Sequence, residues 1–369
     1  MKIKDVRAYT LSVPLKKPWK IAGLVMSEMT ACVVEVESDS GMVGYGEALT
    51  RLGPGATCEV ILSVLKPVVM GADPMNVDVL WEKMFSTMKG RGHWKGFMIE
   101  AISGVDIALW DLIGKALNLP VSTLLGGRHH EKLEAYASSI MLMERSEMVK
   151  EAKTLVRQGF KKIKVKVGLD AETDFGNVQA IREAVGPDIG IMLDANSGFS
   201  TEEALRLGTM LEPLKILWLE EPVPPHDLEG YARLSDALRI PIAGGESEFT
   251  RWGFRDLILR GKVSIIQPDI ARLGGFTEAR KITALASAHG VRVAPHTGAS
   301  GAVSIAAAVH YAASLSNLYI FEHMYTENPL REDTLKVPIL ECHQGFISVP
   351  TGPGLGIELD PSKVKRYRR

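Results

Sequence analysis

Seven ionisable residues follow one another along the second half of the chain at nearly constant spacing. They are separated by 28, 26, 26, 23, 27 and 26 positions and comprise Lys166, Asp194, Glu220, Glu246, Asp269, His296 and Glu322. Each stands at or near the end of a short apolar run. One strand–helix unit of a (β/α)8 barrel has about this length, so the seven side chains are predicted to lie at the carboxyl ends of consecutive strands, where barrel enzymes hold their active sites.

Three of the seven are carboxylates on adjacent predicted strands, namely Asp194, Glu220 and Glu246. Converging carboxylates repel one another unless a hard cation lies among them, and an all-oxygen set favours Mg²⁺ over zinc. Asn196, two residues after Asp194, could assist at the same place. Glu221 directly follows Glu220 and is expected to point elsewhere, because side chains alternate along a strand.

Acid–base chemistry is predicted from Asp269 with His296 and from the lysines of one strand. A carboxylate bonded to one imidazole nitrogen fixes the tautomer and raises the basicity of the other nitrogen. Period 2 places Lys164 and Lys166 on the same inward face. Lys166 can also act as a base if it is held uncharged, which the nearby Lys164 and a divalent cation would favour. Lys166 and His296 belong to strands two and seven, so they are expected to approach a substrate from opposite sides.

The elements that must position these residues alternate between apolar runs and amphipathic helices from about residue 132 onward. The predicted strands are 133–138, 162–167, 190–194, 216–220, 241–244, 263–268, 291–295 and 318–322, with helices such as 146–158, 201–211 and 277–289 between them. This alternation predicts the α/β class and a (β/α)8 barrel. A dinucleotide-binding sheet would need a GxGxxG turn. The nearest pattern, at 41–46, is interpreted as a hairpin.

The first ~125 residues have an α+β pattern. Strands are expected at 3–13, 30–37 and 42–48, and the apolar spacing after residue 99 predicts a helix that ends near residue 118. The periodicity stops after about residue 325, and the last segment is expected to return to the first domain. The predicted domains are therefore residues 1–128, 129–325 and 326–369.

Composition excludes several partners. Lys and Arg number 43 against 44 Asp and Glu, so the basic excess of nucleic-acid or anionic-membrane binding proteins is missing. Three scattered cysteines and a start without an apolar signal region favour a cytoplasmic location. The stretch 293–321 contains no Asp, Glu, Lys or Arg, but it is Ala-rich and interrupted by polar residues. We expect a buried helix there and no membrane span.

In chain order these positions resemble the motifs of the enolase superfamily, specifically the mandelate racemase/muconate lactonizing enzyme family. The matching motifs are Lys164-x-Lys166, Leu193-Asp-Ala-Asn196, Leu219-Glu-Glu-Pro222, Gly244-Gly-Glu246, Gln267-Pro-Asp269, Gly274-Gly-Phe-Thr-Glu278, Ala294-Pro-His296 and Gly352-Pro-Gly-Leu-Gly356. The resemblance covers essentially the whole chain. It implies a modified (β/α)8 TIM barrel with an N-terminal α+β capping domain that the C-terminal segment completes, and assembly into a homo-oligomer.

The resemblance also implies a role for each motif residue. These roles are Mg²⁺ binding by Asp194, Glu220 and Glu246, acid–base catalysis by Lys166, His296 and Asp269, and substrate binding by Lys164, Glu322 and Asn196. Specificity is expected to come from the capping domain, with 15–28 and 50–56 as candidate lid segments and Lys20, Arg51 and Trp94 as candidate lid residues.

The chemistry shared by this family is removal of the α-proton of a small-molecule carboxylate to give an enediolate stabilised by Mg²⁺. By analogy alone, the expected reaction is dehydration of an acid sugar, an aldonate or aldarate, to a 2-keto-3-deoxy acid. Racemisation or epimerisation of a 2-hydroxy acid and cycloisomerisation of a sugar lactone remain alternatives on the same site. A non-catalytic binding protein on this fold is the alternative from a different class.

The sequence disagrees with two classes of hydrolase. A metal-dependent amidohydrolase would need an HxH pair at the end of the first barrel strand, where the chain reads Ala135-Tyr-Ala-Ser-Ser139. A serine hydrolase would need a GxSxG elbow, and the spacing of Gly298-Ala-Ser-Gly301 is wrong for that motif.

Overall fold

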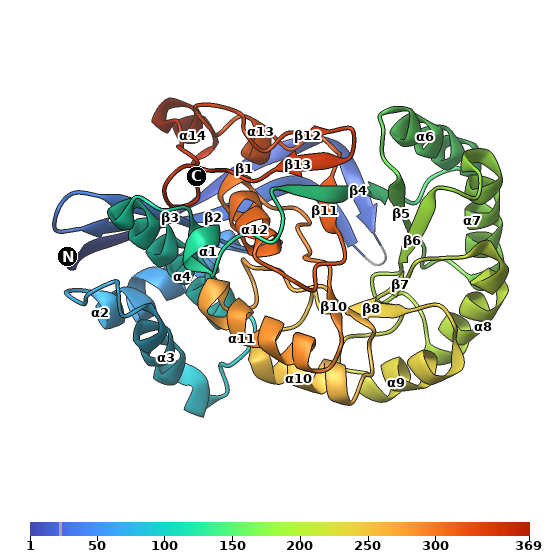
Figure 1. Ribbon diagram of the computed structural model, residues 1–369, viewed down its shortest axis with the longest axis horizontal. Helices are drawn as coiled ribbons and strands as arrows, with labels where there is room; N and C mark the ends of the chain where they lie inside the picture. The colour runs from blue at the N-terminus through green and yellow to red at the C-terminus, as the bar shows by residue number, and fades with distance from the viewer. Residues whose placement is uncertain (22–23) are drawn as a thin grey trace.

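The computed structural model describes the backbone of residues 1–21 and 24–369 and, within these, all side chains except those at positions 17, 20, 21 and 24. Figure 1 shows an antiparallel sheet with its helices beside a closed barrel of parallel strands. The predicted α/β barrel with an N-terminal capping domain is confirmed. The exact domain limits stay a prediction.

The N-terminal sheet has the order β1-β2-β3, formed by β1 (Ile3–Ile21), β2 (Leu24–Ser38) and β3 (Val43–Ala48). Both strands of the first hairpin are longer than predicted, since β1 was expected to end at residue 13 and β2 to begin at residue 30. The added part contains Lys and Pro in place of a hydrophobic alternation, so the sequence pattern did not reveal it. Backbone pairing continues there after a register shift between Pro14 and Trp19.

The rest of this domain consists of helices, several of which pack on the sheet. They are α1 (Pro54–Glu59), the π-helix η1 (Val60–Leu65), α2 (Lys66–Val69), α3 (Val77–Met88), the 3₁₀ turn η2 (Lys89–Arg91), α4 (Phe97–Leu117) and α5 (Val121–Leu124). Helix α4 packs so closely on β3 that a Cβ on Gly44 would lie 2.1 Å from the Ala108 carbonyl oxygen, and one on Gly46 would lie 1.9 Å from that of Gly104. Only Gly41 of the 41–46 pattern belongs to the hairpin turn. The other two glycines permit helix–sheet contact.

Eight parallel strands form the barrel. They are β4 (Lys132–Ile140), β5 (Lys162–Lys166), β6 (Gly190–Asp194), β7 (Leu219–Glu220), β8 (Ile242–Gly244), β9 (Ile265–Ile266), β10 (Arg292–Val293) and β11 (Phe321–Met324). Neighbours pair in order from β4 to β10, β11 pairs with β4, and a parallel bridge from Val293 to Leu318 completes the ring. Strands β7 to β10 are shorter than predicted, because the apolar runs continue beyond the hydrogen-bonded ladder.

Seven helices surround the barrel between its strands. They are α6 (Arg145–Arg157), α7 (Ala171–Val185), α8 (Thr201–Leu211), α9 (Leu228–Ala237), α10 (Thr250–Leu259), α11 (Gly275–Ala288) and α12 (Ala302–Ala313). The 3₁₀ turn η3 (Glu212–Leu214) extends α8. Every residue of α12 is buried, as predicted for the stretch without charges. Among the described residues, no helix has the length and apolar character needed to cross a membrane.

The C-terminal segment contacts both parts of the molecule. Its elements are α13 (Pro329–Glu332), β12 (Cys342–His343), β13 (Phe346–Ser348) and α14 (Pro361–Tyr367). Strand β13 pairs antiparallel with β4, and the chain end returns to β1 through a bridge between Leu11 and Arg368.

A layer of apolar side chains fills the barrel interior below the charged strand ends. It consists of Tyr136, Met192, Trp218, Ala243, Ile265, Ala294 and Ile320, all buried. Because this layer is closely packed, the ionisable residues above it are held on a rigid base.

A buried histidine on α12 predicts acid sensitivity. His310 accepts the Ser122 N–H at Nδ1, and its Nε2 lies 3.1 Å from the Leu355 carbonyl oxygen. Burial lowers the pKa of His310 from 6.5 to about 4. Above pH 6.5 the His310 imidazole is mostly neutral in both the folded and the unfolded state. Below pH 6.5 it binds a proton in the unfolded state but stays neutral in the folded state until about pH 4. Through His310 alone, the free energy of unfolding should therefore fall by about 2 kcal/mol between pH 7.5 and 5.

Denaturant titrations at pH 7.5 and 5 would measure this loss. His310→Gln should show a smaller loss, while His289→Gln, at an exposed position, should keep that of the wild type. The explanation is wrong if His310→Gln loses as much stability as the wild type.

Candidate active site

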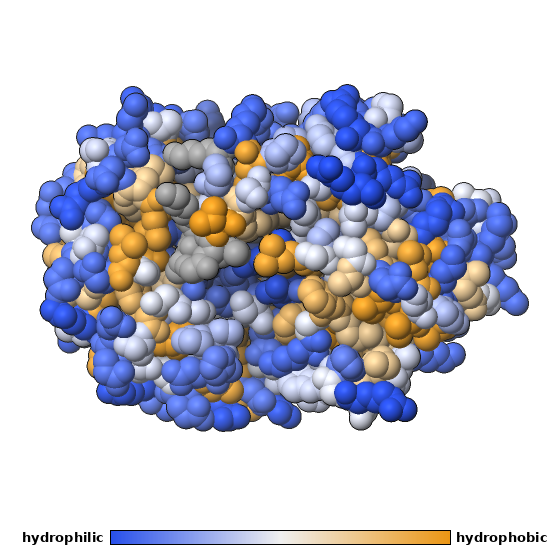
Figure 2. All heavy atoms as spheres, turned by 180° about the vertical axis from the view of Figure 1, so that it is seen from behind, coloured by the Kyte–Doolittle hydropathy of each residue, from blue (hydrophilic) through white to orange (hydrophobic). Residues whose placement is uncertain are grey.

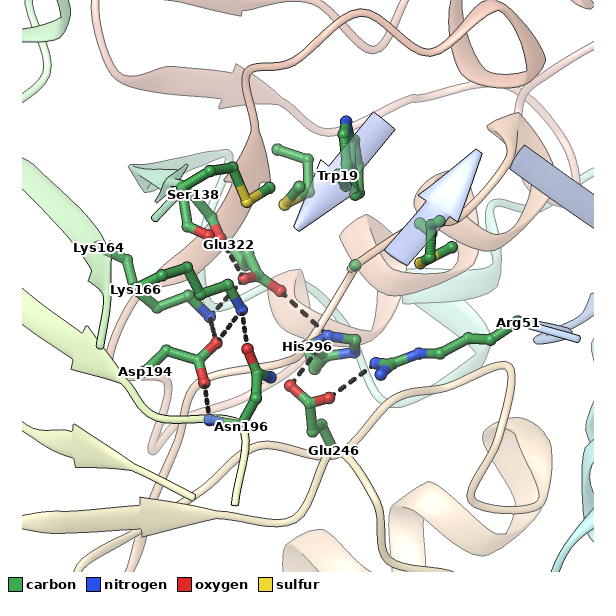
Figure 3. A pocket seen from close by; sticks show the side chains of 16 residues that line it. Trp19, Arg51, Ser138, Lys164, Lys166, Asp194, Asn196, Glu246, His296 and Glu322 are labelled. Atoms are coloured by element: carbon green, nitrogen blue, oxygen red, sulfur yellow. Dashed lines mark hydrogen bonds and ion pairs between the residues drawn. The ribbon is translucent and has the colours of Figure 1, made fainter. Parts of the chain in front are cut away.

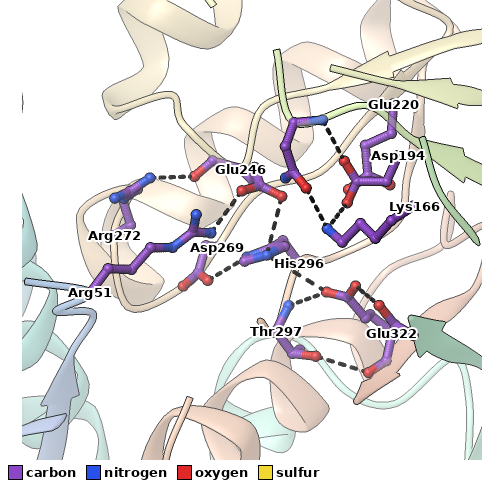
Figure 4. A network of polar contacts seen from close by, with 12 residues as sticks. Arg51, Lys166, Asp194, Glu220, Glu246, Asp269, Arg272, His296, Thr297 and Glu322 are labelled. Carbon is purple, nitrogen blue, oxygen red and sulfur yellow. Dashed lines mark hydrogen bonds and ion pairs between the residues drawn. The ribbon is translucent and has the colours of Figure 1, made fainter. Parts of the chain in front are cut away.

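The seven regularly spaced residues lie together at the carboxyl ends of the barrel strands (Figures 3 and 4). Lys166, Asp194 and Glu220 end β5, β6 and β7, and direct strand pairing joins Lys166 to Asp194 and Asp194 to Glu220. The next three follow their strands by two or three residues, and the last lies within β11. They are Glu246, Asp269, His296 and Glu322. The spacing thus reflects a common place in each strand–helix unit.

Three buried carboxylates form a cluster that could hold a metal ion. One oxygen from each of Asp194, Glu220 and Glu246 lies within 4.8 Å of the other two. Burial and then repulsion by Asp194 raise the pKa of Glu220 to about 7. Such crowding of like charges in a dry interior is costly without a cation. The all-oxygen donor set and the close approach of the three carboxylates fit Mg²⁺.

Cationic side chains contact this cluster from several sides. The Lys166 Nζ lies 2.5 Å from Asp194 Oδ2, and an Arg51 Nη2 lies 2.7 Å from Glu246 Oε1. The Lys164 Nζ lies 2.8 Å from Glu220 Oε1 and 2.7 Å from Glu322 Oε1. Burial disfavours the charged form of Lys164, but attraction to these carboxylates outweighs it and raises its pKa well above the usual value.

The predicted pair of Asp269 and His296 is present. Asp269 Oδ2 lies 2.8 Å from His296 Nδ1, and Nε2 of the same ring lies 3.3 Å from Glu246 Oε2 (Figure 4). Burial opposes protonation of His296, but Glu246, Glu322 and Asp269 together raise its pKa to about 9. Asp269 also accepts the Ala271 N–H, which fixes the carboxylate behind the ring.

Glu322 and Asn196 have partners that the sequence did not indicate. Glu322 accepts hydrogen bonds from the Ser138 hydroxyl at 2.7 Å and the Thr297 N–H at 2.6 Å. Burial would raise the pKa of Glu322, but Lys164 and His296 lower it to about 2. Asn196 accepts a hydrogen bond from Lys166 at 2.7 Å. Serine at the end of the first barrel strand was the available signal for Ser138, since every other strand end carries a site residue.

A cavity of about 40 Å³ lies among these residues. Its charged side is the set described above, and its other side is apolar, formed by Trp19, Met26, Met141 and Met324. The first two belong to the β1–β2 hairpin, which therefore reaches the barrel mouth (Figure 3). Figure 2 shows hydrophobic side chains bordering a recess with hydrophilic ones inside it.

The three lid candidates have different positions. Arg51 lines the cavity, and its role as a lid residue stays a prediction. Trp94 is 41% exposed, does not line the described cavity, and has the Lys95 ammonium over its ring. The side chain of Lys20 lies outside the described residues. Among the candidates, contact with the cavity is thus established for Arg51.

Known proteins are similar to this chain over its whole length. The chain is 36% identical to D-galactarolactone cycloisomerase of Agrobacterium fabrum, covering 100% of this chain and 99% of the relative. It is 37% identical to arabinonate dehydratase of Saccharolobus solfataricus, covering 99% of each. A solved racemase from Streptomyces coelicolor with bound magnesium superimposes with a TM-score of 0.92 at 29% identity, covering 100% of both chains.

Two family models match almost the entire sequence. The N-terminal domain of mandelate racemase / muconate lactonizing enzyme matches residues 4–126, and the enolase C-terminal domain-like family matches residues 147–363. These matches, the capped barrel and the buried acidic cluster at its mouth agree with one another. The protein belongs to the mandelate racemase/muconate lactonizing enzyme family of the enolase superfamily.

Proposed function

We propose that this protein removes the α-proton of an acid sugar and dehydrates it to a 2-keto-3-deoxy acid in the presence of Mg²⁺. The observation that carries the proposal is the placement of Lys166 and the His296–Asp269 pair on different barrel strands around one carboxylate cluster. When bound at Asp194, Glu220 and Glu246, Mg²⁺ would polarise the substrate carboxylate and stabilise the negative charge that develops on it.

The chain's own residues account for the proton transfers. Lys166 or His296 takes the α-proton as the C–H bond breaks, and the electron pair moves toward the carboxylate. The other group then donates a proton to the β-hydroxyl, which leaves as water, and the enol product tautomerises to the keto acid. Asp269 holds the imidazole of His296 throughout, because it is fixed by the Ala271 N–H.

Lys164 and Glu322 contribute to substrate binding in this proposal. Both are buried at the cavity, and their ion pair of 2.7 Å places opposite charges next to each other there. The ammonium of Lys164 can attract the substrate carboxylate, and the Glu322 carboxylate can accept a hydrogen bond from a substrate hydroxyl. Arg51 lines the same cavity and adds a cationic side chain to those of Lys164 and Lys166.

Cycloisomerisation of a sugar lactone is the second candidate. It uses the same α-carbon chemistry, and the relative from Agrobacterium fabrum that carries this activity in its name is 36% identical over the full length. The arabinonate dehydratase is equally similar at 37%. The two reactions differ in the bond to the β-oxygen, which belongs to a hydroxyl in one case and to a lactone ring in the other.

A panel of aldonates, aldarates and sugar lactones with Mg²⁺ in D₂O would test the proposal. We expect an acid sugar to give a keto acid, which a carbonyl assay would detect. We also expect exchange of its α-hydrogen, which NMR would detect. Exchange with inversion and no keto acid would favour a racemase or epimerase, and turnover of lactones alone would favour the cycloisomerase. The proposal is contradicted if no member of the panel shows exchange of its α-hydrogen or formation of a product.

A further inference from the structure

A buried carboxylate from the capping domain lies against the start of barrel helix α12. Glu47, on β3, is 2% exposed. Its Oε1 accepts the Gly301 N–H at 2.6 Å and its Oε2 accepts the Ser304 N–H at 3.1 Å. Helix α12 begins after Gly301, and no side-chain hydrogen bond from that residue caps it. Glu47 therefore supplies the N-terminal cap from a strand more than 250 positions away in the chain.

The fit between this carboxylate and the helix is close. A Cβ on Gly301 would lie only 2.8 Å from Glu47 Oε2, so a side chain at position 301 would displace the Glu47 carboxylate. Burying an ionisable group is unfavourable unless its hydrogen bonds are satisfied, and burial raises the pKa of Glu47 to about 7 against the effect of its backbone hydrogen bonds. Because burial of the Glu47 carboxylate is unfavourable and its contacts are close, we expect it to have a specific structural role at the start of α12.

The segment that enters α12 carries the proposed acid–base histidine. His296 precedes the helix by six residues, and Gly298 and Ala299 between them line the cavity. A Cβ on Gly298 would lie 2.6 Å from Cε1 of the His296 imidazole, so the backbone of the segment packs directly on the ring. A shift of the helix start would therefore move the surface against which the ring rests.

Other residues hold the rest of the segment between His296 and α12, and Glu47 binds the backbone N–H at its end. The Thr297 N–H is held by Glu322, and the carbonyl of Ser300 accepts a hydrogen bond from Asn328. The next backbone N–H, that of Gly301, is the one bound by Glu47. The residue that follows β3 is also attached to the barrel, since the Leu49 N–H donates to the Ala271 carbonyl oxygen.

We propose that Glu47 is a positioning residue for His296: by capping α12 it fixes the loop that packs on the imidazole. The capping domain then has a part in the proton chemistry besides its part in substrate choice. This inference rests on the role given to His296 under the proposed function.

Glu47→Gln is the main test. The amide keeps the size of the side chain but turns an NH₂ toward one of the two backbone N–H groups, which removes half of the cap. We expect kcat to fall roughly tenfold or more with KM changed by less than about threefold, because the substrate contacts remain. The side-chain NMR signals of His296, identified by their absence in His296→Asn, should shift in Glu47→Gln.

Asp111→Asn is the matched control. Asp111 is also a buried carboxylate that accepts two backbone N–H groups, those of Tyr45 and Leu355, in addition to the Lys115 ammonium, and it does not line the described cavity. It should lose thermal stability to a similar degree while its kcat stays within about twofold of the wild type and its His296 signals stay unchanged. Gly301→Ala provides a second variant, because it displaces the cap while the carboxylate is retained.

The two proposals fail in different ways. An unchanged kcat and unchanged His296 signals in soluble Glu47→Gln, or in Gly301→Ala if Glu47→Gln does not fold, would overturn the positioning role. An equal loss of kcat in Asp111→Asn would also overturn it, since a general loss of stability would then explain both variants. If the wild type is inactive on every substrate, the proposed function fails, and the NMR comparison still decides whether Glu47 positions the ring.

Discussion

Replacing His296 by Asn is expected to lower kcat by roughly 10²–10⁴-fold, the usual contribution of a positioned acid or base. Asparagine keeps a hydrogen-bonding side chain next to Asp269 but cannot exchange a proton near neutral pH. Lys166→Met should cause a loss of similar size, because it removes the ammonium that lies 2.5 Å from Asp194 while it retains most of the side-chain volume. Steady-state kinetics on the substrate found in the panel would measure both losses.

Deuterium exchange would show which residue takes the α-proton. The variant that lacks the base should lose exchange and product together, whereas the variant that lacks the acid should retain exchange and lose product. His226→Asn, at an exposed position, is the control and should keep wild-type kinetics. Wild-type rates in either Lys166→Met or His296→Asn would contradict the role given to that residue.

Glu220→Gln is expected to weaken Mg²⁺ binding by at least roughly 10–100-fold, since even residues that only support metal ligands have effects of that size. The substitution removes one of three carboxylates that lie within 4.8 Å of one another and keeps the shape of the side chain. Calorimetric titration with Mg²⁺ would measure the affinity without substrate. The Mg²⁺ dependence of kcat/KM should shift in the same direction.

The adjacent Glu221 provides a matched control. It is also buried, but it is not part of the three-carboxylate cluster. Burial and then repulsion by Glu246 raise the pKa of Glu221 to about 8, and Glu221→Gln keeps the size and shape of this buried side chain. Glu221→Gln should therefore bind Mg²⁺ within a few-fold of the wild type. Equal losses in Glu220→Gln and Glu221→Gln would contradict the assignment of the cluster.

The sequence predicted the barrel and the meeting of its strand ends because both follow from local patterns. A repeat of about 26 residues fixes where each strand–helix unit ends, and the period of 2 in strand β5 fixes that Lys164 and Lys166 share a face. Whether neighbouring strands bring Asp194 and Glu220 together then depends only on the order of the units. These features need no knowledge of contacts between distant segments.

The features that the sequence did not predict depend on such contacts. The hydrogen bond of Ser138 to Glu322 joins the first and the last barrel strand, and that of Thr297 joins the loop after β10 to β11. The scatter of the cysteines along the chain also gave no sign that the free thiols of Cys32 and Cys58 lie 2.8 Å apart. In each case the residue types are ordinary, and only the three-dimensional packing brings them together.

The lid was the least predictable part of the candidate site. Arg51 and Trp94 are both predicted lid residues, but the first lines the cavity and the second is exposed. Loop direction decides between them, and loops carry no periodic pattern from which that direction could be inferred. Trp19 and Met26 both fall within the predicted lid segment 15–28 and line the cavity, although the hairpin that carries them lacks the alternation of a half-buried strand.

The reach of the β1–β2 hairpin has a consequence for how such a chain changes over generations. Trp19 and Met26 contact the cavity from a short segment near the N-terminus, whereas the ionisable residues lie on strands far along the chain. Substitutions near the hairpin end can reshape the cavity wall without disturbing any described ion pair among the strand ends. We expect inherited changes in this one segment to alter which substrate the cavity accepts, while the strand-end residues of the proposed proton chemistry stay the same.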